Sequence, residues 1–556
     1  MKNLDVLIRN LIKAKVKTPE DLALAKRKLA KKYKVPLSSN ASLLKSYHEM
    51  VRNKTPHQNT PVVERSSLRG KRLGTGQGLK PSKTLEKLLV TRPIRSLSGI
   101  VNVSVLTKSY PCPGKCLYCP IQKGVPKSYL SNEPAVMRAI QNKYDPYKQV
   151  KTRLKSLENT GHVTDKIELR IIGGTWSYYP KRYREWFITR CFAACNAELR
   201  GTRRRTTRNI ISLKEEQKRN EKTKHRIVGL SIETRPDFIN EVEIKHLREL
   251  GVTMVELGVQ TIYDDVLEKN LRGHKVKETI SATKLLKDAG FKVLYQMMPN
   301  LPGSDTEKDL KIFKELFSDP DFQPDLLKIY PCALLKEAPL YKLWKAGKYN
   351  PYSKKELVDL VKKIKKIIPY YVRIQRITRD IPAQSIVAGP AKISNLRQVL
   401  AENAKKEKWQ CKCIRCREIK GDYNSREKLC LFRESYNASE GKEIFLSFEN
   451  KKRSKIFSLL RLRIPSPDKG IRTLRDSAII REIHTYGQVH SIGKEKNLLS
   501  PQHKGLGKKL IRESEKITKR EFGLRKISVI SGVGARDYYR KLGYKLKNTY
   551  MVKKIS

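Results

Sequence analysis

The stretch Tyr110-Pro-Cys112-Pro-Gly-Lys-Cys116-Leu-Tyr-Cys119-Pro120 decides the fold of the chain around it. Its three cysteines follow the spacing C-x3-C-x2-C, and the prolines and glycine between them predict an exposed loop rather than a core strand. Three thiolates on one loop can point at one small inorganic cluster. Iron–sulfur clusters are usually held by four cysteines, and no fourth ligand stands at a similar spacing. One iron would therefore stay open to a ligand that is not protein.

An open iron is what a radical S-adenosylmethionine (SAM) enzyme needs, because SAM chelates that iron and accepts an electron there. The alternatives are a zinc loop and three buried thiols. Structural zinc normally has four closed ligands, so the three-cysteine loop favours the cluster. We therefore predict that Cys112, Cys116 and Cys119 bind an iron–sulfur cluster with SAM on its open site.

Length and composition indicate several domains in a reducing compartment. The 556 residues suffice for roughly three or four domains, and 39% hydrophobic residues can fill their cores. No run of about 18 apolar residues could span a membrane, and the N-terminus lacks the apolar core of a secretion signal. The 10 cysteines have the distribution of metal sites rather than of a disulfide framework. We therefore expect a cytoplasmic protein without a membrane partner.

The charge balance indicates a polyanionic partner. The chain has 118 basic and 55 acidic residues, a net charge of +63. Such a field attracts nucleic acid, although a lysine-rich genome would also produce this composition. The first hundred residues carry 23 basic against 6 acidic side chains, and Arg200–Arg226 carry 11 against 3. This uneven distribution partly supports a nucleic-acid partner over a lysine-rich genome as the explanation of the charge.

Residues 1–82 are predicted to form a small basic helical region with a connector. Apolar residues repeat at helical spacing between positions 4 and 12, and Thr18-Pro19-Glu20-Asp21 is a helix start signal. The basic helix faces either dock on a phosphate backbone or are simply solvated, and the sequence leaves both open. Residues 56–82 follow as a connector rich in glycine, proline and arginine.

Strands and helices alternate between residues 83 and 395. The predicted strands are Ile100–Leu106, Lys166–Ile172, Ile227–Ile232, Met254–Val259, Lys292–Met298 and Leu326–Tyr330. Units of this kind form a parallel, barrel-like sheet with the chemistry at the C-terminal ends of the strands. The segments at these ends are the cysteine loop, Gly173-Gly174, Glu233–Asp237, Glu256, Gln260 and Pro299–Gly303. Gly173 and Gly174 are more often only a turn, but beside a cluster loop they offer a backbone edge for the methionyl group of SAM.

Residues 396–440 form a short, charged segment with a second group of cysteines. Cys411, Cys413 and Cys416 follow the spacing C-x-C-x2-C. Thiolates this dense in a reducing cell usually bind zinc, which would stabilise a linker too small for its own core. Cys430 is the nearest candidate for a fourth ligand, and a second redox cluster is the alternative.

The last region, residues 441–556, has the pattern of a GNAT-type acetyl-CoA-binding domain. Its predicted strands are Ile444–Phe448, Lys455–Arg463, Ala478–Tyr486 and Lys526–Ile530, and its predicted helices are Lys508–Arg520 and Ala535–Tyr544. The longer helix opens with Gln502-His-Lys-Gly505-Leu-Gly507. Free backbone N–H groups at a glycine-rich helix start can bind a pyrophosphate.

Motifs in both halves resemble the family of the Elongator catalytic subunit, which also occurs as a single protein in archaea and some bacteria. In the first half they are Arg92–Gly99, Cys116–Pro120, Glu133–Ile140, Tyr144–Tyr147, Gly173–Thr175, Ile232–Asp237, Glu256–Gln260 and Asn270–His274. In the second half they are Arg481–Gly487, Ser531–Gly534 and Tyr538–Lys541. Pattern and resemblance together predict an α/β multidomain chain. A radical-SAM partial (β/α) barrel at 83–395 is expected to be fused to a GNAT-type acetyltransferase domain at 441–556 through a zinc-binding linker at 396–440.

The resemblance implies C5-carboxymethylation of uridine 34, the wobble uridine of tRNA, with SAM and acetyl-CoA as cofactors. It implies a 4Fe-4S cluster on the three cysteines, the anticodon stem-loop of tRNA as a partner, and an electron donor. Reductive cleavage of SAM would give a radical that takes hydrogen from the acetyl methyl group, and the resulting carbon would join C5 before hydrolysis releases CoA. The implied acetyl-CoA contacts are Lys166, Glu482, Ile483, His484, Thr485, Leu506, Gly507, Lys508 and Tyr539.

Lys166 and Tyr539 are the predicted catalytic residues. A contact at Lys166 would make acetyl-CoA bridge both domains, and Tyr539 would donate a hydrogen bond or act as an acid at the thioester; its alternative role is core packing. Two departures from the family pattern are Ile121-Gln122, where the family usually has Gly-Gly, and a longer, more basic tract at 202–225. A protein lysine acetyltransferase is the alternative function, but that activity has no use for a cluster loop. The sequence leaves open whether the chain forms a homodimer.

Overall fold

The computed structural model describes residues 2–52, 82–197, 211–393, 395–420, 424, 426–466, 471–487 and 505–555. The chain divides into two compact units, Met1–Ser96 with Arg153–Thr164, and Leu97–Thr152 with Asp165–Ser556. Gln502 and, apart from Ser82, the predicted connector lie outside the described residues. The basic tract predicted at 202–225 is described from residue 211 onward.

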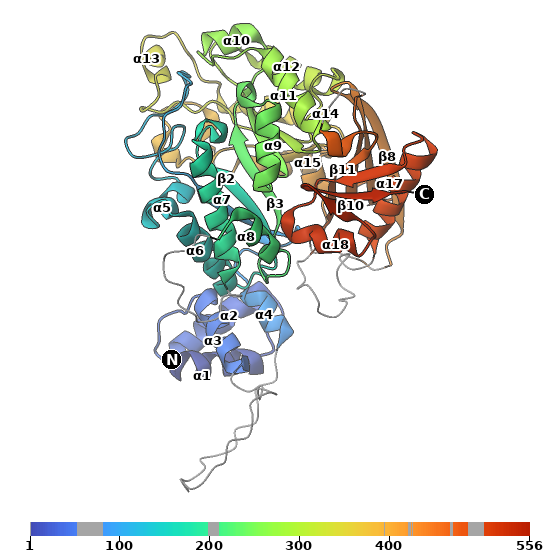
Figure 1. Cartoon of the computed structure of the whole chain (residues 1–556). Coiled ribbons are helices and arrows are strands. Elements are labelled where there is room, and N and C mark those ends of the chain that lie inside the picture. Colours follow the sequence, from blue (N-terminus) through green and yellow to red (C-terminus); the bar gives the residue numbers. More distant parts are fainter. Residues whose placement is uncertain are drawn as a thin grey trace. The chain divides into compact units, whose positions relative to one another are not determined.

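The described part of the smaller unit includes the helices α1 (Lys2–Lys13), α2 (Pro19–Lys32), α3 (Asn40–Arg52) and α4 (Lys83–Leu89) (Figure 1). The N-terminal helices predicted from the apolar spacing are confirmed. α2 begins at the predicted start signal, where the Thr18 hydroxyl accepts from the Asp21 N–H and the Asp21 carboxylate accepts from the Thr18 N–H. One apolar core joins the helices, and α4 contributes to it beyond residue 82.

The larger unit begins with a parallel, seven-stranded sheet. Its strands, in spatial order, are β1 (Val101–Leu106), β2 (Lys166–Ile172), β3 (Arg226–Thr234), β4 (Met254–Gln260), β5 (Lys292–Met297), β6 (Leu326–Ile329) and β7 (Arg373–Arg376). Every neighbouring pair is parallel. In the described part of the chain β1 does not pair with β7, so the sheet is a partial barrel, as predicted.

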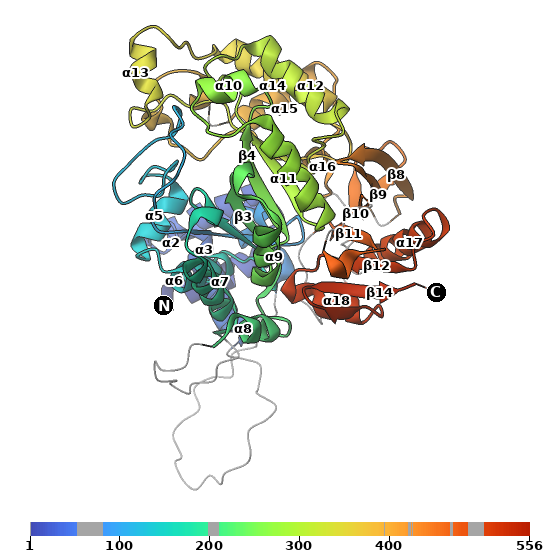
Figure 2. The same cartoon turned by 45° about the horizontal axis from the view of Figure 1, so that its top comes forward.

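Helices between the strands pack against the outer face of this sheet, which α7, α9 and α11 illustrate in Figures 1 and 2. The helices of this region are α5 (Pro134–Gln141), α6 (Pro146–Asn159), α7 (Lys181–Cys195), α8 (Leu213–Asn220), α9 (Glu241–Leu250), α10 (Asp264–Lys269), α11 (Val276–Asp288), α12 (Thr306–Ser318), α13 (Leu340–Lys345) and α14 (Lys354–Ile367). Because each strand is entered from a helix on the same side, all C-terminal strand ends meet at one rim. No helix among these or the other described helices is long and apolar enough to cross a membrane.

A second seven-stranded sheet forms the C-terminal part of the larger unit. Its spatial order is β13 (Lys545–Lys547), β14 (Tyr550–Lys554), β12 (Lys526–Val529), β11 (Ala478–Thr485), β10 (Ile456–Ile464), β9 (Gly441–Asn450) and β8 (Leu429–Ala438). Helix α17 (Leu506–Arg520) buries Leu510 and Ile511 against this sheet, and the short helix α18 (Arg536–Arg540) follows β12. The strands and helices predicted for 441–556 are present.

The linker in the structure is shorter than the predicted range, 396–440. α15 (Leu396–Lys406) and α16 (Ile414–Arg417) lie in it, but its last part is strand β8, which pairs with β9 along its whole length. The linker is tied to both sheets: the Ile414 N–H donates to Val372 before β7, and Arg417 forms a buried ion pair with Glu449 of β9 at 2.6 Å.

The second sheet packs on the N-terminal ends of the barrel strands. Arg481 of β11 bonds both oxygens of Asp325, which immediately precedes β6, at 2.5 and 2.8 Å. Glu482 of β11 pairs with Lys292, the first residue of β5, at 3.4 Å. Since the cysteine loop follows the C-terminal end of β1, it lies at the opposite end of the barrel from the second sheet.

Candidate active site

The cysteine loop leaves β1 and is held in place by backbone hydrogen bonds to later segments of the barrel. The Leu117 N–H donates to Asn270 at 3.2 Å, and the Leu117 carbonyl accepts from the Leu340 N–H at 2.8 Å. Lys127 Nζ donates to the Gly114 carbonyl at 2.5 Å. The loop is therefore shaped by chain that is far away in sequence.

The space between the first two thiols is lined by sulfur and by cationic nitrogen. A Cβ on Gly114 would stand 3.4 Å from Cys116 Sγ, 3.8 Å from Cys112 Sγ and 2.6 Å from Arg235 Nη1. Only glycine leaves this space free. Arg272 Nη1 donates to Cys116 Sγ at 3.5 Å. Thiols with positive charge beside them fit an anionic iron–sulfur cluster.

The thiols differ in their ionisation. Burial raises the pKa of Cys116, but the charge and hydrogen bond of Arg272 outweigh burial, so the pKa lies below the usual value. Burial, with the neighbouring Cys116 thiolate, raises the pKa of Cys119 to about 12. A cysteine binds a metal as its thiolate, and Cys116 is the cysteine whose surroundings most favour the thiolate.

Several buried polar atoms around the loop have no hydrogen-bond partner among the described residues. They are Arg235 Nη1, Thr261 Oγ1, Arg272 Nε and His274 Nε2. His274 Nδ1 lies 3.1 Å from the Lys275 carbonyl and so carries the proton, which leaves Nε2 as an acceptor. Unpaired buried polar atoms are costly, and their concentration at one end of the barrel indicates a ligand site there.

Gly173 and Gly174 lie at the end of β2 beside the loop. Gly173 has a φ of 133°, and a Cβ there would come within 2.0 Å of Thr107 Oγ1. The following residue, Thr175, has its hydroxyl 3.7 Å from Cys112 Sγ. The structure thus brings the predicted backbone edge next to the thiols.

Below the loop, a layer of charged and polar side chains fills the barrel interior. Arg170 Nη2 donates to Glu256 at 2.7 Å, and Lys328 Nζ bonds both Glu256 and, at 3.0 Å, Glu233. Gln296 Nε2 donates to Glu233 at 3.1 Å. The sequence motifs contained Glu233 and Glu256 but gave no indication of this network, because its members come from five different strands.

An apolar layer lies one step closer to the N-terminal ends of the strands. Met254, Leu294 and Leu326 form a buried cluster, each two residues before a member of the polar layer on the same strand. Residues two apart share a face of a strand, so the two layers stack along the barrel axis. Side chains therefore occupy the axis between the two ends.

In the second sheet, β11 pairs with β12 along only part of its length. β11 and β12 pair at three positions, Ala478–Ile480 with Ile527–Val529, so this pairing ends before Glu482–Thr485. α17 begins nearby with Gly505 at a φ of 77°. A Cβ on Gly507 would lie 3.5 Å from Ile483, 3.9 Å from Thr485 Oγ1 and 3.0 Å from Tyr538 Oη. A strand end beyond this pairing, beside a helix N-terminus, suits an extended, phosphate-bearing ligand.

The predicted acetyl-CoA residues have different surroundings in the structure. Ile483, Thr485 and Gly507 converge, whereas the side chain of Lys508 is exposed. Tyr539 is 5% exposed and belongs to the apolar core of the second sheet. Its neighbour Tyr538 faces Gly507 instead, and burial raises the pKa of Tyr538 to about 12.

Glu482 and His484 connect the second sheet to the barrel. Glu482 pairs with Arg461 at 2.8 Å as well as with Lys292. Burial raises the pKa of Glu482, but these two cations lower it to about 2. His484 Nε2 donates to the Ser98 carbonyl, just before β1, at 2.7 Å. Both side chains are thus used in contacts between the two sheets.

Lys166 is the first residue of β2 and lies at the barrel end that carries the second sheet. Burial lowers the pKa of Lys166. The seven residues of β2, at about 3.3 Å each, place its two ends roughly 20 Å apart. Lys166 and the cysteine loop are therefore at opposite ends of the barrel.

The second group of cysteines is a compact trio. The Sγ atoms of Cys411, Cys413 and Cys416 lie within 4.8 Å of one another. Lys365 Nζ lies 3.4 Å from Cys416 Sγ, and although burial opposes it, the three thiols raise the pKa of Lys365. Cys430 lies in β8 opposite Glu449 and is not part of this trio, so its predicted role as fourth ligand has no geometric support.

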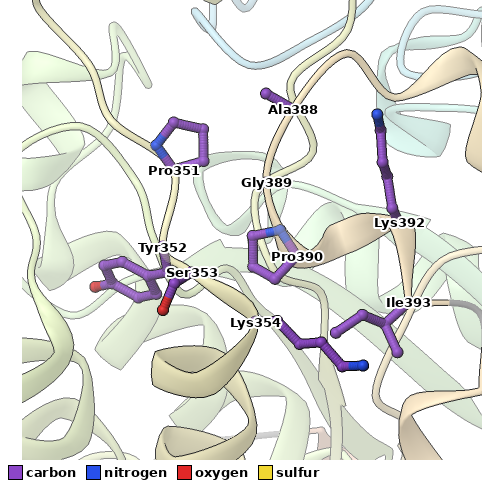
Figure 3. A pocket seen from close by; sticks show the side chains of 9 residues that line it. All are labelled: Pro351, Tyr352, Ser353, Lys354, Ala388, Gly389, Pro390, Lys392 and Ile393. Atoms are coloured by element: carbon purple, nitrogen blue, oxygen red, sulfur yellow. The ribbon is translucent and has the colours of Figure 1, made fainter.

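A separate pocket of about 430 Å³ lies between the start of α14 and the segment before α15 (Figure 3). Its lining comprises Pro351, Tyr352, Ser353, Lys354, Ala388, Gly389, Pro390, Lys392 and Ile393. No predicted site residue is among them. The N–H of Glu356 donates to the Ser353 hydroxyl and that of Ser353 donates to the Glu356 carboxylate, so these two donors at the start of α14 are satisfied within the helix start.

Comparison with known proteins gives matches that cover both the barrel and the second sheet. The Radical SAM superfamily model matches residues 107–316, and the model of the Radical_SAM C-terminal domain matches residues 324–406. The chain is 46% identical to the "tRNA uridine(34) acetyltransferase" of Methanocaldococcus jannaschii over 483 residues, 85% of this chain and 87% of that protein. It is 38% identical to human "Elongator complex protein 3" over 491 residues, 85% and 87% of the two chains.

The chain belongs to the Elongator complex protein 3 family. The archaeal Methanocaldococcus infernus Elp3, solved with an N-terminal deletion, superimposes with a TM-score of 0.71 at 42% identity, covering 83% of this chain and 100% of that one. The predicted fold class, a radical-SAM partial barrel joined to a second α/β domain, is therefore confirmed, and the sheet of the second domain is mixed.

One departure from the Elongator complex protein 3 pattern has a structural explanation. Where the family usually has Gly-Gly after the cluster loop, Gln122 here closes the following turn through its side-chain amide. Gln122 Nε2 donates to Ser131 Oγ at 3.0 Å, and Oε1 accepts from the Ser131 N–H at 2.8 Å. Ile121 is 60% exposed, and its N–H donates to Glu337 at 3.0 Å. The exit of the loop is held by side-chain bonds that two glycines could not make.

Proposed function

We propose that the chain modifies uridine 34 of tRNA at C5, with a 4Fe-4S cluster, SAM and acetyl-CoA as cofactors. The observation that carries the proposal is the presence of the three-thiol loop and the β11–α17 edge in one compact unit. The names of the relatives, tRNA uridine(34) acetyltransferase and Elongator complex protein 3, support the substrate. A stand-alone lysine acetyltransferase would need only the second site.

The residues of the chain hold and separate the reactants. Cys112, Cys116 and Cys119 would hold the cluster, and Gly173-Gly174 would bind the methionyl group of SAM. When bound, the cluster and SAM supply radical chemistry and acetyl-CoA supplies the carbon unit. The α17 start at Gly505–Lys508, with Gln502, would bind the CoA pyrophosphate, and Glu482–Thr485 and Tyr539 would contact the rest of acetyl-CoA.

In this proposal, acetyl-CoA would be held along the side of the barrel where, among the described residues, β1 and β7 do not pair with each other. The barrel axis is filled by the two layers described above, so a direct axial route is closed. The end of β11 contacts the chain at both of these strands: His484 bonds Ser98 before β1, and Arg373 of β7 donates to the Tyr486 hydroxyl at 3.2 Å. Lys166 stands at the same end and would guide the acyl chain along that side.

Three further assignments belong to the proposal. Cys411, Cys413 and Cys416 would bind zinc and so fix the linker between the two sheets. The basic N-terminal helices would bind tRNA. A low-potential electron donor would reduce the cluster.

Anaerobic reconstitution with iron and sulfide tests the proposal. The loaded protein should form 5′-deoxyadenosine from SAM, and with tRNA and acetyl-CoA it should release CoA and carboxymethylate uridine 34. Lys166→Ala should lower CoA release and uridine modification together. Wild-type acetylation of lysine peptides by Lys166→Ala, without uridine modification by the parent protein, would support the acetyltransferase instead.

A further inference from the structure

Arg272 is fixed against the most buried thiol of the cysteine loop. Its Nη1 donates to Cys116 Sγ at 3.5 Å, while its Nη2 donates to the Gly258 carbonyl at the end of β4 at 2.5 Å. The side chain is 7% exposed. Two bonds from one planar group determine its orientation, so the guanidinium charge is held beside the sulfur.

Arg235 approaches the same loop from β3. The carboxylate of Asp237 accepts from Nε at 2.9 Å and from Nη2 at 2.8 Å, which fixes the guanidinium plane. The remaining nitrogen, Nη1, is buried without a hydrogen-bond partner among the described residues. It lies 2.6 Å from the position that a Gly114 Cβ would take, in the space next to the Cys112 and Cys116 sulfurs.

A buried guanidinium N–H without an acceptor costs free energy. Arg235 is only 5% exposed, so bulk water has little access to this group. An acceptor in the thiol-lined space would satisfy it, and the sulfur atoms of a bound cluster are acceptors. The two arginines come from positions 235 and 272, yet they converge on one loop at 112–119.

We propose that Arg235 and Arg272 are positioning residues that raise the reduction potential of the cluster bound by Cys112, Cys116 and Cys119. The inference rests on the cluster of the proposed function. One electron from an external low-potential reductant adds one negative charge to the cluster, with no bond broken and no proton taken up. Fixed cations and N–H···S hydrogen bonds stabilise the more negative state, and the potentials of such clusters depend on these bonds and on nearby charge.

The test is the midpoint potential of the reconstituted cluster, measured by electron paramagnetic resonance during a redox titration with dithionite. Arg272→Met and Arg235→Met should each lower the potential by about 59 mV, a tenfold change in the one-electron equilibrium. Arg272→Lys keeps the positive charge but loses the planar guanidinium that forms both hydrogen bonds, and it should lower the potential by less. Arg248→Met removes a buried guanidinium at the other end of the barrel and should leave the potential unchanged.

The outcomes are distinguishable. The signal comes only from cluster-loaded chains, so partial loading does not affect the comparison. An unchanged potential in both methionine variants, an equal decrease in Arg248→Met, or a loss of iron from every Arg235 and Arg272 variant would overturn the inference. Failure of the parent protein to bind iron would instead contradict the proposed function.

Discussion

Among the three thiols of the cysteine loop, Cys116 has the surroundings that best support metal binding. It is the buried one of the three, and it receives the hydrogen bond of Arg272. The lowered pKa of Cys116, in spite of burial, means that the thiolate is stabilised before any metal arrives. Loss of this ligand should therefore be more harmful than loss of a buried cysteine elsewhere.

Cys116→Ala should abolish iron binding and 5′-deoxyadenosine formation but leave acetyl-CoA binding intact, because the second site lies at the other end of the barrel. Iron per chain and deoxyadenosine yield are the measurements. Cys195→Ala, in a buried cysteine of α7, is the matched control and should keep its iron. SAM cleavage at the parent rate by Cys116→Ala would refute the cluster assignment.

Tyr539 allows packing and chemistry to be separated. Its ring belongs to the core of the second sheet, and Tyr544 lies 5.9 Å from it. Tyr539→Ala should lower the free energy of unfolding by about 3–5 kcal/mol through the cavity it leaves. Tyr539→Phe should keep the parent stability and, if the hydroxyl acts at the thioester, lower CoA release at least tenfold. Parent turnover in Tyr539→Phe would assign the residue to packing alone.

Single residues were predictable from the sequence only where the ligands share one loop. The cysteine trios at 112–119 and 411–416 have informative spacings, and the structure brings the second trio together. The contact of Arg272 with Cys116 joins residues 156 positions apart, and the motif around Arg272 gave no reason for its charge. Tyr538 and Tyr539 are adjacent in sequence, and only the fold shows that Tyr538 faces Gly507.

At the scale of elements, strands β1 to β6 of the barrel were predicted, and the edge strands β7 and β8 were not. β2 has the predicted bounds, because its apolar and charged residues alternate with the period of a strand. β7 is only Arg-Ile-Gln-Arg, and it lies at the edge of the barrel sheet, where one buried side chain suffices. β8 alternates in burial along Leu429–Ala438 as an edge strand does, but its charged residues resemble the linker before it.

The linker gives a prediction that compares two cysteines. Cys413→Ser should release zinc and lower the melting temperature, because the trio holds the segment that joins β7 to the second sheet. Cys430→Ser is the control: its strand position opposite Glu449 places it outside the trio, so zinc content should not change. Metal analysis of both variants is decisive. Zinc loss in Cys430→Ser would restore Cys430 as the fourth ligand.

At the scale of the whole molecule, the net charge of +63 predicts salt-dependent RNA binding. Arg27, Lys28 and Lys31 are exposed on α2, away from its core. Replacing the three by glutamine should weaken tRNA binding and reduce the slope of log K against log salt by about 0.7 per lost phosphate contact. The same change at the exposed Lys311, Lys314 and Lys355 is the control. Equal slopes for both triple variants would show that the α2 charge is not specific to tRNA.

The contact between the barrel and the second sheet is unusual in its buried charge. Arg461, Arg463 and Arg481 are at most 2% exposed, and their partners Asp325 and Glu443 are buried as well. Such networks stabilise the fold little relative to apolar packing, but the fold is strongly destabilised when one partner of a buried ion pair is lost. They also specify one register, since each of these cations contacts two carboxylates that must be in place at the same time. We infer that the two sheets unfold together.

Asp325→Asn tests this coupling. Burial raises the pKa of Asp325, but Arg481 and Arg461 outweigh it and hold the pKa below its usual value. A carboxyl with a lowered pKa stabilises the fold above its unfolded pKa of about 3.9, and this stabilisation is lost as the pH falls toward the folded value. The variant should lose about 3–5 kcal/mol of unfolding free energy at pH 7 and show a shallower loss of stability below pH 4 than the parent.

Glu521→Gln is the control: it removes an exposed partner of Arg433 and should lower the unfolding free energy by at most about 1 kcal/mol. Urea unfolding followed by probes in each sheet would measure both effects, and separate transitions for the two sheets in the parent protein would contradict the inference that they unfold as one.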